Sequence, residues 1–115
     1  MELEETDSLL RRVQFTNPDF IKDDGTPASS SFSLKKGEQG LSVDLEKLTI
    51  LEKSILDPER FRLYSLKVSD CTNLGLNCEH DPVEDNPAHS LIMAPISRGA
   101  SRQLAKASKR VAYPD

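Results

Sequence analysis

The sequence predicts a single α+β domain, built from a small, mostly antiparallel sheet flanked by two principal helices. Its 115 residues are 37% apolar and 30% charged, which is typical of one soluble globular domain. Several short stretches alternate apolar and polar residues, as half-buried strands do. Two longer stretches, 44–56 and 97–111, instead repeat apolar residues every three or four positions, which is the spacing of a helix face.

The amino-terminal part predicts one strand and a long connection. Residues 1–8 carry four acids and no base, and we expect a flexible end there, followed by the domain over residues 9–115. Residues 9–15 alternate as a strand does, although Leu10 interrupts the alternation. The Asn, Pro, Asp and Gly residues that follow are turn formers, so we expect an extended connection over residues 16–30.

The middle of the chain predicts a hairpin and then the first helix. Residues 31–34 and 40–44 both alternate, and the Lys-Lys-Gly-Glu-Gln-Gly between them favours a hairpin or a sheet corner. Leucines at helical spacing predict a helix over residues 44–56, with Asp44 as its N-cap. Pro58 is suited to the first position of one further short helical turn.

The second half predicts two more strands and the last helix. Residues 61–68 and 90–93 read as strands, and Gly75 is placed to end a short helical turn between them. Residues 97–111 carry one apolar stripe at a period of 3.6, with Ser97 as N-cap. We expect the Tyr-Pro pair that follows to end this helix.

Charge is distributed unevenly along a chain whose net charge is −4. Residues 79–85 carry four acids, and the last helix carries a basic series: Arg98, Arg102, Lys106, Lys109 and Arg110. The two segments either pair with each other or form separate acidic and basic poles. We therefore expect binding contacts through Asp81 and Asn86 in the first segment, and through Arg98, Arg102 and Lys106 in the second.

The chain predicts a cytosolic protein without a membrane span. The amino terminus lacks the apolar stretch of a secretory signal, and no apolar run approaches the roughly eighteen residues that a span requires. In a reducing compartment, Cys71 and Cys78 are expected to be free thiols.

The stretch 79–93 gathers the most reactive side chains. Asp81-Pro82 and Asn86-Pro87 each force extended backbone before the proline, so the stretch is a stiff loop that delivers His89 to the start of a strand. With Asp85 to orient it, His89 could act as a general base. The alternative is structural, because a histidine that hydrogen-bonds a backbone carbonyl can simply hold the loop in place.

Metal and cofactor chemistry is not indicated by the sequence. Cys71, Cys78, His80 and His89 lie within nineteen residues, but they lack the closely spaced cysteine pair of structural zinc sites. The alternative to a zinc site is that both cysteines are buried and unreactive. No P-loop, dinucleotide-binding or serine-hydrolase motif is present. We therefore expect neither a metal nor a cofactor.

Three segments, Ser29-Ser30-Ser31-Phe32, Leu41-Ser42-Val43-Asp44 and the run from Asp81 to His89, resemble in order and spacing a family of small bacterial proteins without an assigned activity. The resemblance extends over residues 9–113 and implies a compact α+β domain.

More distantly, an early arginine followed by a serine-bearing segment is similar to the layout of ADP-ribosyltransferase-like folds of the RES type. That resemblance implies that Arg11 matches a nucleotide-binding arginine and that Ser30 or Ser31 matches a central serine. The chain differs in lacking a late-strand catalytic glutamate and in being short, so the resemblance is an analogy of fold.

Three functions remain open at this point. The first is a small bacterial interaction or accessory protein that works with a larger protein partner, which the missing catalytic motifs and the polar poles favour. The second is an enzyme, a nucleotide-handling transferase or a hydrolase, in which His89 is the base, Asp85 orients it, and Arg11 and Ser31 contact the substrate. The third is nucleic-acid binding through the basic last helix, which the net negative charge and the scarcity of aromatic residues disfavour.

Overall fold

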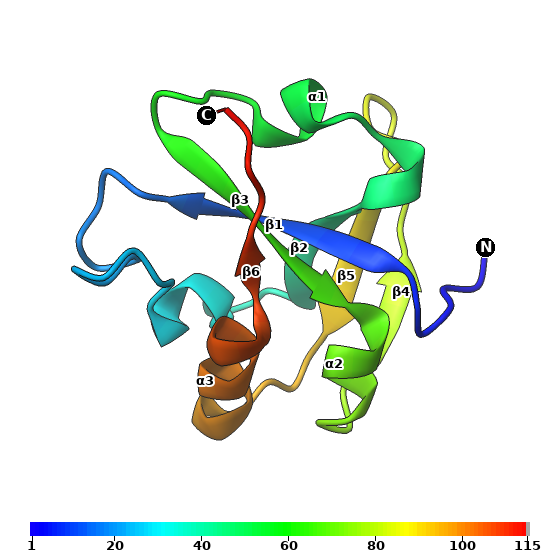
Figure 1. Cartoon of the computed structure of the whole chain (residues 1–115). Helices are drawn as coiled ribbons and strands as arrows, with labels where there is room; N and C mark the ends of the chain where they lie inside the picture. The colour runs from blue at the N-terminus through cyan, green and yellow to red at the C-terminus, as the bar shows by residue number, and fades with distance from the viewer. Residues whose placement is uncertain (115) are drawn as a thin grey trace.

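The computed structural model describes residues 1–114 and confirms the α+β class (Figure 1). A six-stranded antiparallel sheet has the order β4-β5-β2-β1-β3-β6. Its strands are β1 (Ser8–Gln14), β2 (Gly40–Leu45), β3 (Phe61–Lys67), β4 (Cys78–His80), β5 (His89–Met93) and β6 (Lys109–Arg110). The helices are α1 (Leu51–Ile55), α2 (Val68–Thr72) and α3 (Arg98–Ala107), with 3₁₀ turns η1 (Ser29–Phe32) and η2 (Glu46–Leu48).

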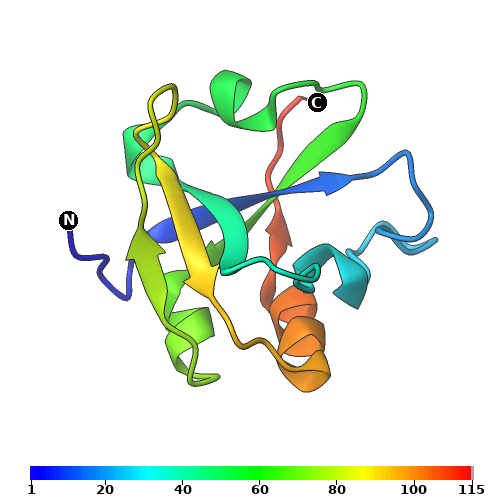
Figure 2. The same ribbon diagram turned by 180° about the vertical axis from the view of Figure 1, so that it is seen from behind.

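The sheet bends sharply where β1 meets β2. These strands pair only at Leu9 with Leu45 and at Leu10 with Asp44. Along its whole length β1 pairs with β3 over seven residue pairs, while β2 pairs with β5 over five. The sheet is therefore divided into two halves, β4-β5-β2 and β1-β3-β6, whose strands cross steeply (Figure 2).

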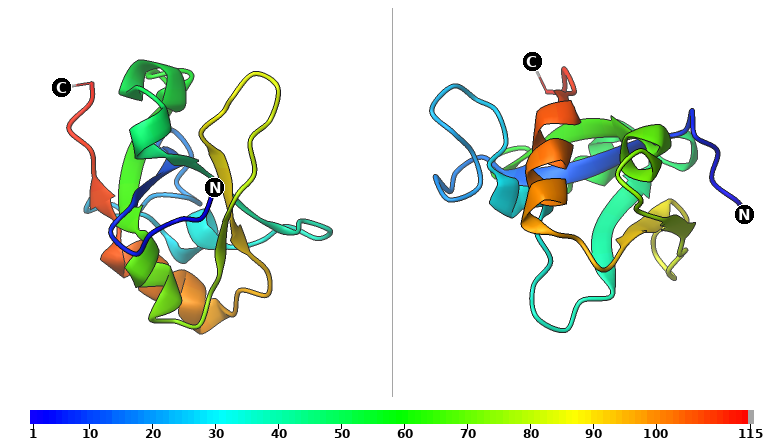
Figure 3. Two further views of the ribbon diagram at one scale, coloured as in Figure 1. Left: turned by 90° about the vertical axis from the view of Figure 1, so that its right-hand side faces the viewer. Right: turned by 90° about the horizontal axis from the view of Figure 1, so that it is seen from below.

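The main hydrophobic core fills the space between the two halves. It is closed by η1, α2 and α3, which lie at one end of the molecule (Figure 3). Its best-buried side chains are at most 1% exposed: Leu9, Phe32, Leu41, Leu45, Cys71, Ile92 and Leu104. A smaller cluster of Leu10, Ile55 and Leu63 lies on the other face of β1 and β3, beneath α1. Burial of apolar area in these two clusters is the main stabilising contribution to the fold.

Two predictions about the middle of the chain are wrong. Residues 29–32 form the turn η1 rather than part of a strand over 31–34. The Ser33 hydroxyl donates to the Ser29 carbonyl one turn earlier, and the Ser30 and Ser31 hydroxyls donate to the carbonyls of Asp19 and Phe20, so serine side chains hold the curled backbone. The hairpin therefore does not form, and β2 pairs with β1 and β5 instead.

The predicted helix over 44–56 is also wrong in its extent. Asp44 is no N-cap but a residue of β2, which runs to Leu45, and only η2 and the five residues of α1 are helical. The alternation of residues 40–45 overrides the weaker helical spacing, since it buries Leu41, Val43 and Leu45 against the core. Pro58 starts a turn and not a further helix.

The last helix begins as predicted and ends early. Ser97 is the N-cap, and its hydroxyl accepts a hydrogen bond from the Ala100 N–H at 3.0 Å. α3 ends at Ala107 and not at Val111, because Lys109 and Arg110 pair with β3. None of the helices within residues 1–114 is long and apolar enough to cross a membrane.

The acidic amino-terminal segment is attached to the domain through its backbone. The carbonyls of Glu5 and Asp7 accept hydrogen bonds from the N–H groups of Ser69 and Val68 at the start of α2, each at 3.0 Å. β1 then begins at Ser8, one residue before the strand that the sequence predicts.

The pairing of β2 with β5 leaves no room for a side chain at Gly40. A Cβ atom at this position would lie 2.7 Å from the Ile92 carbonyl oxygen, so we expect Gly40→Ala to lower the free energy of unfolding by about 1–3 kcal/mol. Gly99→Ala is the matched control, because its Cβ would meet only Ser97 Oγ at 3.8 Å. In a helix the control should raise stability by about 0.5–1 kcal/mol. Urea titration of both variants measures the difference, and equal midpoints would contradict the β2–β5 register.

Candidate functional site

The outer face of β2 and β5 carries a row of polar side chains. Leu41, Val43 and Leu45 face the core, so Ser42 and Asp44 between them face outward. The register places Asp44 directly opposite His89 on β5. Side chains opposite each other in an antiparallel pair lie on the same face of the sheet, which makes Asp44 and His89 neighbours.

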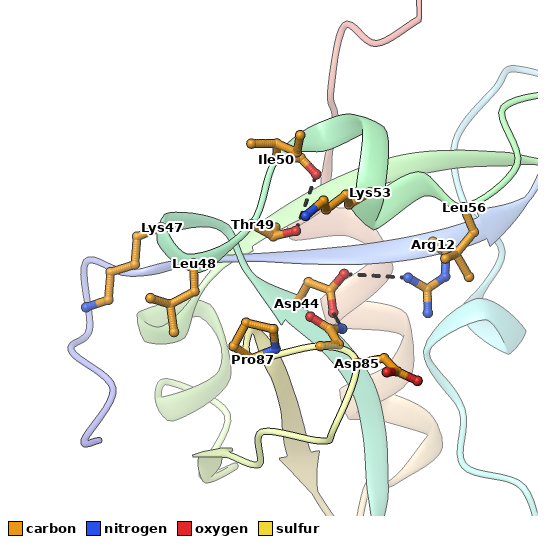
Figure 4. Close-up of a pocket in the computed structure, with 11 residues that line it drawn as sticks. Arg12, Asp44, Lys47, Leu48, Thr49, Ile50, Lys53, Leu56, Asp85 and Pro87 are labelled. Carbon is orange, nitrogen blue, oxygen red and sulfur yellow. Dashed lines mark hydrogen bonds and ion pairs between the residues drawn. The ribbon is translucent and has the colours of Figure 1, made fainter.

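Asp44 is nevertheless buried, with 3% of its surface exposed. Its Oδ1 accepts a hydrogen bond from the side-chain amide of Asn86 at 2.8 Å, and its Oδ2 accepts one from the Ser54 hydroxyl at 2.7 Å. Arg12 Nη1 lies 3.6 Å from the same Oδ2 and donates to the Ser54 carbonyl at 2.6 Å. This buried carboxylate network joins β1, β2, α1 and the loop between β4 and β5. Figure 4 shows its Arg12–Asp44 pair.

A groove of about 570 Å³ lies over this network. Residues of the 47–56 segment form one wall and residues 85–87 of the β4–β5 loop form the other, while Arg12 and Asp44 line the floor. The two walls rise side by side at the end of the molecule away from α3 (Figure 3). Two large apolar side chains on the wall are exposed: Ile50 at 53% and Leu56 at 68%.

Leu56 is held in a backbone conformation that leucine rarely adopts. Its φ is 64° and its ψ is −59°, and it is the one non-glycine residue with a positive φ in residues 1–114. The Asp57 N–H donates to the Ile55 carbonyl at 2.7 Å across it, which makes a γ-turn. The turn holds an apolar side chain on the surface at a cost in backbone strain, an arrangement that often marks a functional position.

We expect Leu56→Gly to stabilise the protein by about 1 kcal/mol. Glycine adopts a positive φ without strain, and the leucine side chain contributes little burial to offset the gain. Thermal unfolding measures the change. Leu74→Gly, just after α2, is the control and should destabilise, since Leu74 is only 36% exposed and has no positive φ to relieve. A loss of stability in Leu56→Gly would show that the γ-turn is not strained.

His89 on β5 contacts β2 and the residue that follows β4 through its two ring nitrogens. Nδ1 lies 2.9 Å from the Asp81 carbonyl oxygen and 3.2 Å from Asp81 Oδ2, and Nε2 lies 3.1 Å from Ser42 Oγ. The carbonyl can only accept, so Nδ1 carries the proton, and Nε2 accepts from the Ser42 hydroxyl. Ser42, His89 and Asp81 therefore have the connectivity of a serine–histidine–aspartate relay.

The carboxylate that contacts His89 is Asp81 and not Asp85, the residue expected to orient it. The Asp81 N–H donates to the His89 carbonyl, so the two residues lie opposite each other across the β4–β5 pair. Val83 and Asn86 pair with each other at the tip of the loop and leave Asp85 exposed there. Asp85 lies on the wall of the groove.

Arg11 and Ser31 lie in contact with each other but not in one hollow with His89. Arg11 Nε donates to the Ser31 carbonyl at 2.9 Å and Nη1 donates to the Ser42 carbonyl at 2.8 Å. The Ser31 hydroxyl donates to the Phe20 carbonyl at 2.6 Å. Arg11 and Ser31 line a separate hollow of about 390 Å³. Arg11 thus satisfies backbone carbonyls where β1 and β2 diverge, and burial lowers the pKa of its guanidinium.

The four candidate metal ligands do not gather at one place. Cys71 and Cys78 are free thiols packed in the main core. The neighbouring Cys78 thiol, and burial after it, raise the pKa of Cys71, and the Cys71 thiol lowers the pKa of Cys78. His80 Nε2 lies 2.7 Å from the Pro87 carbonyl oxygen. Within residues 1–114, no three His, Cys, Asp or Glu side chains gather as a metal site.

The basic residues of α3 lie far from the acidic loop. α3 is at the opposite end of the molecule from α1 and the β4–β5 loop (Figure 1). The ion pairs found among residues 1–114 are Arg12–Asp44, Lys47–Asp7 and His89–Asp81. Arg98, Arg102 and Lys106 are exposed and take part in none of them. The charges therefore form separate poles rather than an internal pair.

The sequence did not single out four residues as members of a functional site: Arg12, Ser42, Asp44 and Ser54. Strict alternation over residues 40–45 was the available signal, since it places Ser42 and Asp44 on one face. Comparisons of the chain with protein-family models, curated proteins and solved structures give no match. The function is therefore argued from the geometry of the site.

Proposed function

We propose that the protein is an interaction module, and that its groove binds a short extended segment of a larger protein partner. The observation that carries this proposal is the pair of exposed apolar side chains, Ile50 and Leu56, held over a buried polar floor. Exposed apolar side chains gathered at one concave place are typical of protein-binding surfaces.

The floor supports binding rather than catalysis. Both oxygens of Asp44 already accept hydrogen bonds from neighbouring side chains, and no buried side-chain nitrogen or oxygen of residues 1–114 lacks a hydrogen-bond partner. A carboxylate with its oxygens occupied is a poor general base. It instead fixes the relative positions of the two walls, because Ser54 belongs to one and Asn86 to the other.

The chemistry of the walls defines the partner segment. Ile50 and Leu56 lie at the two ends of α1 on the same wall, and each offers exposed apolar surface to an apolar side chain of the partner. Lys53 on the same wall and Asp85 on the opposite wall are exposed and form no ion pair with a described residue. They suit an acidic and a basic residue flanking the apolar one, in an extended peptide that lies along the groove.

Peptide selection tests this proposal without knowledge of the partner. The protein is immobilised and random peptides are selected from a display library, with the Leu56→Asp variant as a parallel target. We expect wild-type protein to enrich peptides with an acid, an apolar residue and a base in close succession, and Leu56→Asp to enrich none of them. The same peptides selected on both targets would exclude the groove as the binding site.

A second candidate function is ester hydrolysis, which the Ser42–His89–Asp81 relay favours. With Asp81 holding the proton on Nδ1, His89 Nε2 could take the proton of Ser42 Oγ as that oxygen attacks an acyl group. The attack would form an acyl-serine and release the alcohol, and water would then hydrolyse the acyl-serine. This candidate uses His89 as a base, with a different carboxylate and serine from those predicted.

The hydrolase candidate predicts turnover of a small activated ester, such as p-nitrophenyl acetate. Ser42→Ala and His89→Gln should each lower kcat/KM by about a hundredfold or more, because either change interrupts the relay. Ser65→Ala is the control, since Ser65 lies on β3 away from the relay, and it should leave the rate unchanged. Equal rates in all four proteins would assign the relay a purely structural role in holding the loop.

A further inference from the structure

A second concave surface lies at the other end of the molecule, where α3 packs on η1. Ser101 on α3 donates through its hydroxyl to the Phe32 carbonyl at 2.9 Å, and Ser33 Oγ lies 3.3 Å from Ser101 Oγ. The contact leaves a hollow of about 470 Å³ lined by Ser29, Ser30, Ser33, Arg98, Ser101 and Arg102. Four serines and two arginines thus line one small space.

An adjoining hollow of about 350 Å³ shares Ser29 and Arg102 with the first. Two of its lining residues, Pro27 and Ala105, offer apolar surface, and two others, Lys22 and Lys106, add positive charge. Among residues 1–114, no carboxylate lines either hollow. A protein with a net charge of −4 therefore has four cations, and no acid of the described residues, along one groove.

Three of these cations lie close together on α3 and repel one another, and no described acid side chain compensates their charge. Arg98, Arg102 and Lys106 follow one another at i, i+4 on α3 and so lie on one face, over about 12 Å of helix. Like charges at this spacing destabilise a helix by a few tenths of a kcal/mol per pair. No described carboxylate lies within ion-pair distance of any of them. An anion bound in the groove would offset this repulsion.

We propose that this groove is a binding site for a small phosphorylated molecule. The phosphate lies in the serine-lined hollow between Arg98 and Arg102, whose guanidinium groups match phosphate oxygens bidentately. The Ser29 hydroxyl, which forms no hydrogen bond with any residue in 1–114, donates to the same phosphate. The organic part of the ligand lies against Pro27 and Ala105 in the adjoining hollow. This site is independent of the peptide groove.

A small ligand fits this surface better than a long polyanion. Arg98, Arg102 and Lys106 extend over only about 12 Å of helix, whereas a nucleic-acid strand needs a basic track over many phosphates. The aromatic contacts that base stacking would need are also missing from the lining, which contains no aromatic residue.

Calorimetric titration at low salt with inorganic phosphate, ribose 5-phosphate, AMP and adenosine tests the proposal. We expect AMP and ribose 5-phosphate to bind with a Kd below about 1 mM, inorganic phosphate to bind about tenfold more weakly, and adenosine not to bind. Arg98→Gln and Arg102→Gln should each weaken AMP binding at least tenfold, while Lys36→Gln, an exposed cation outside both hollows, should not.

Thermal unfolding separates a binding role from a structural one. Arg102→Gln should keep or raise the melting temperature of the ligand-free protein, because it removes like-charge repulsion on α3. Failure of every phosphorylated probe to bind, equal affinity for adenosine and AMP, or unchanged affinity in both arginine variants would overturn the proposal. Much tighter binding of a twenty-nucleotide single strand than of AMP would also overturn it, and would assign the surface to nucleic acid.

Discussion

Asp44→Ala is expected to lower the free energy of unfolding by about 3 kcal/mol, the largest effect of any single polar substitution in this chain. The aspartate is buried, and its removal leaves the Asn86 amide and the Ser54 hydroxyl facing a cavity without an acceptor. The Arg12 guanidinium loses its charge partner at the same time. Because the two walls of the groove meet at Asp44, the loss should also loosen the β4–β5 loop.

Asp44→Asn is the matched variant, and Glu46→Ala is the surface control. The introduced asparagine keeps an oxygen for Asn86 but presents an NH₂ group to Ser54 and Arg12, so we expect a loss of about 1–2 kcal/mol. Glu46 is exposed, and its substitution should change stability by less than about 0.5 kcal/mol. Chemical denaturation ranks the three variants. If Asp44→Ala unfolded at the same denaturant concentration as Glu46→Ala, the network would not hold the walls together.

Ile50→Asp combined with Leu56→Asp is expected to weaken binding of the selected peptide by a hundredfold or more, which corresponds to about 2.7 kcal/mol. Both substitutions place a charge where the partner's apolar side chain is buried, and desolvating an unpaired carboxylate there is costly. The fold should be unaffected, because Ile50 and Leu56 are 53% and 68% exposed. Fluorescence anisotropy with a labelled peptide measures the affinities.

Two charge variants refine this result. Asp85→Lys and Lys53→Glu should each weaken binding by about three- to tenfold, and the double exchange should bind best to a peptide whose flanking charges are exchanged as well. Such compensation would establish the direction of the peptide in the groove. Unchanged affinity in all of these variants would place the peptide elsewhere on the surface.

Strands of this fold were predictable where the apolar residues that alternate in the sequence are also the ones that the core buries. Residues 61–68 and 90–93 read as strands and form β3 and most of β5, since their apolar residues are the ones that the core buries. The segment 44–56 was misread because Leu45, Leu48 and Leu51 fit a helical period by chance. Tertiary pairing of β2 with β5 overrides that local pattern.

The candidate site was predictable only in part, because the pairing of the strands decides which side chains meet there. His89 was singled out from the sequence, but its partners depend on the register of three strands, which no local pattern reveals. Asp85 is closer in sequence, yet the turn at residues 83–86 points it to the groove and leaves Asp81 opposite His89. Arg12 and Ser54 are 42 residues apart in the chain, and their contact follows from the packing of α1 on β1.

Site-specific photo-cross-linking tests the central claim, that the groove beside Asp44 holds a partner segment. A photoreactive amino acid replaces Leu56 in one protein and Leu74, exposed just after α2, in the control. After irradiation in extracts of the source cells, mass spectrometry identifies the cross-linked peptides. We predict that position 56 cross-links to one segment of one protein, with an apolar residue between an acid and a base, and that position 74 does not. Equal labelling from both positions, or none from position 56, would contradict the account.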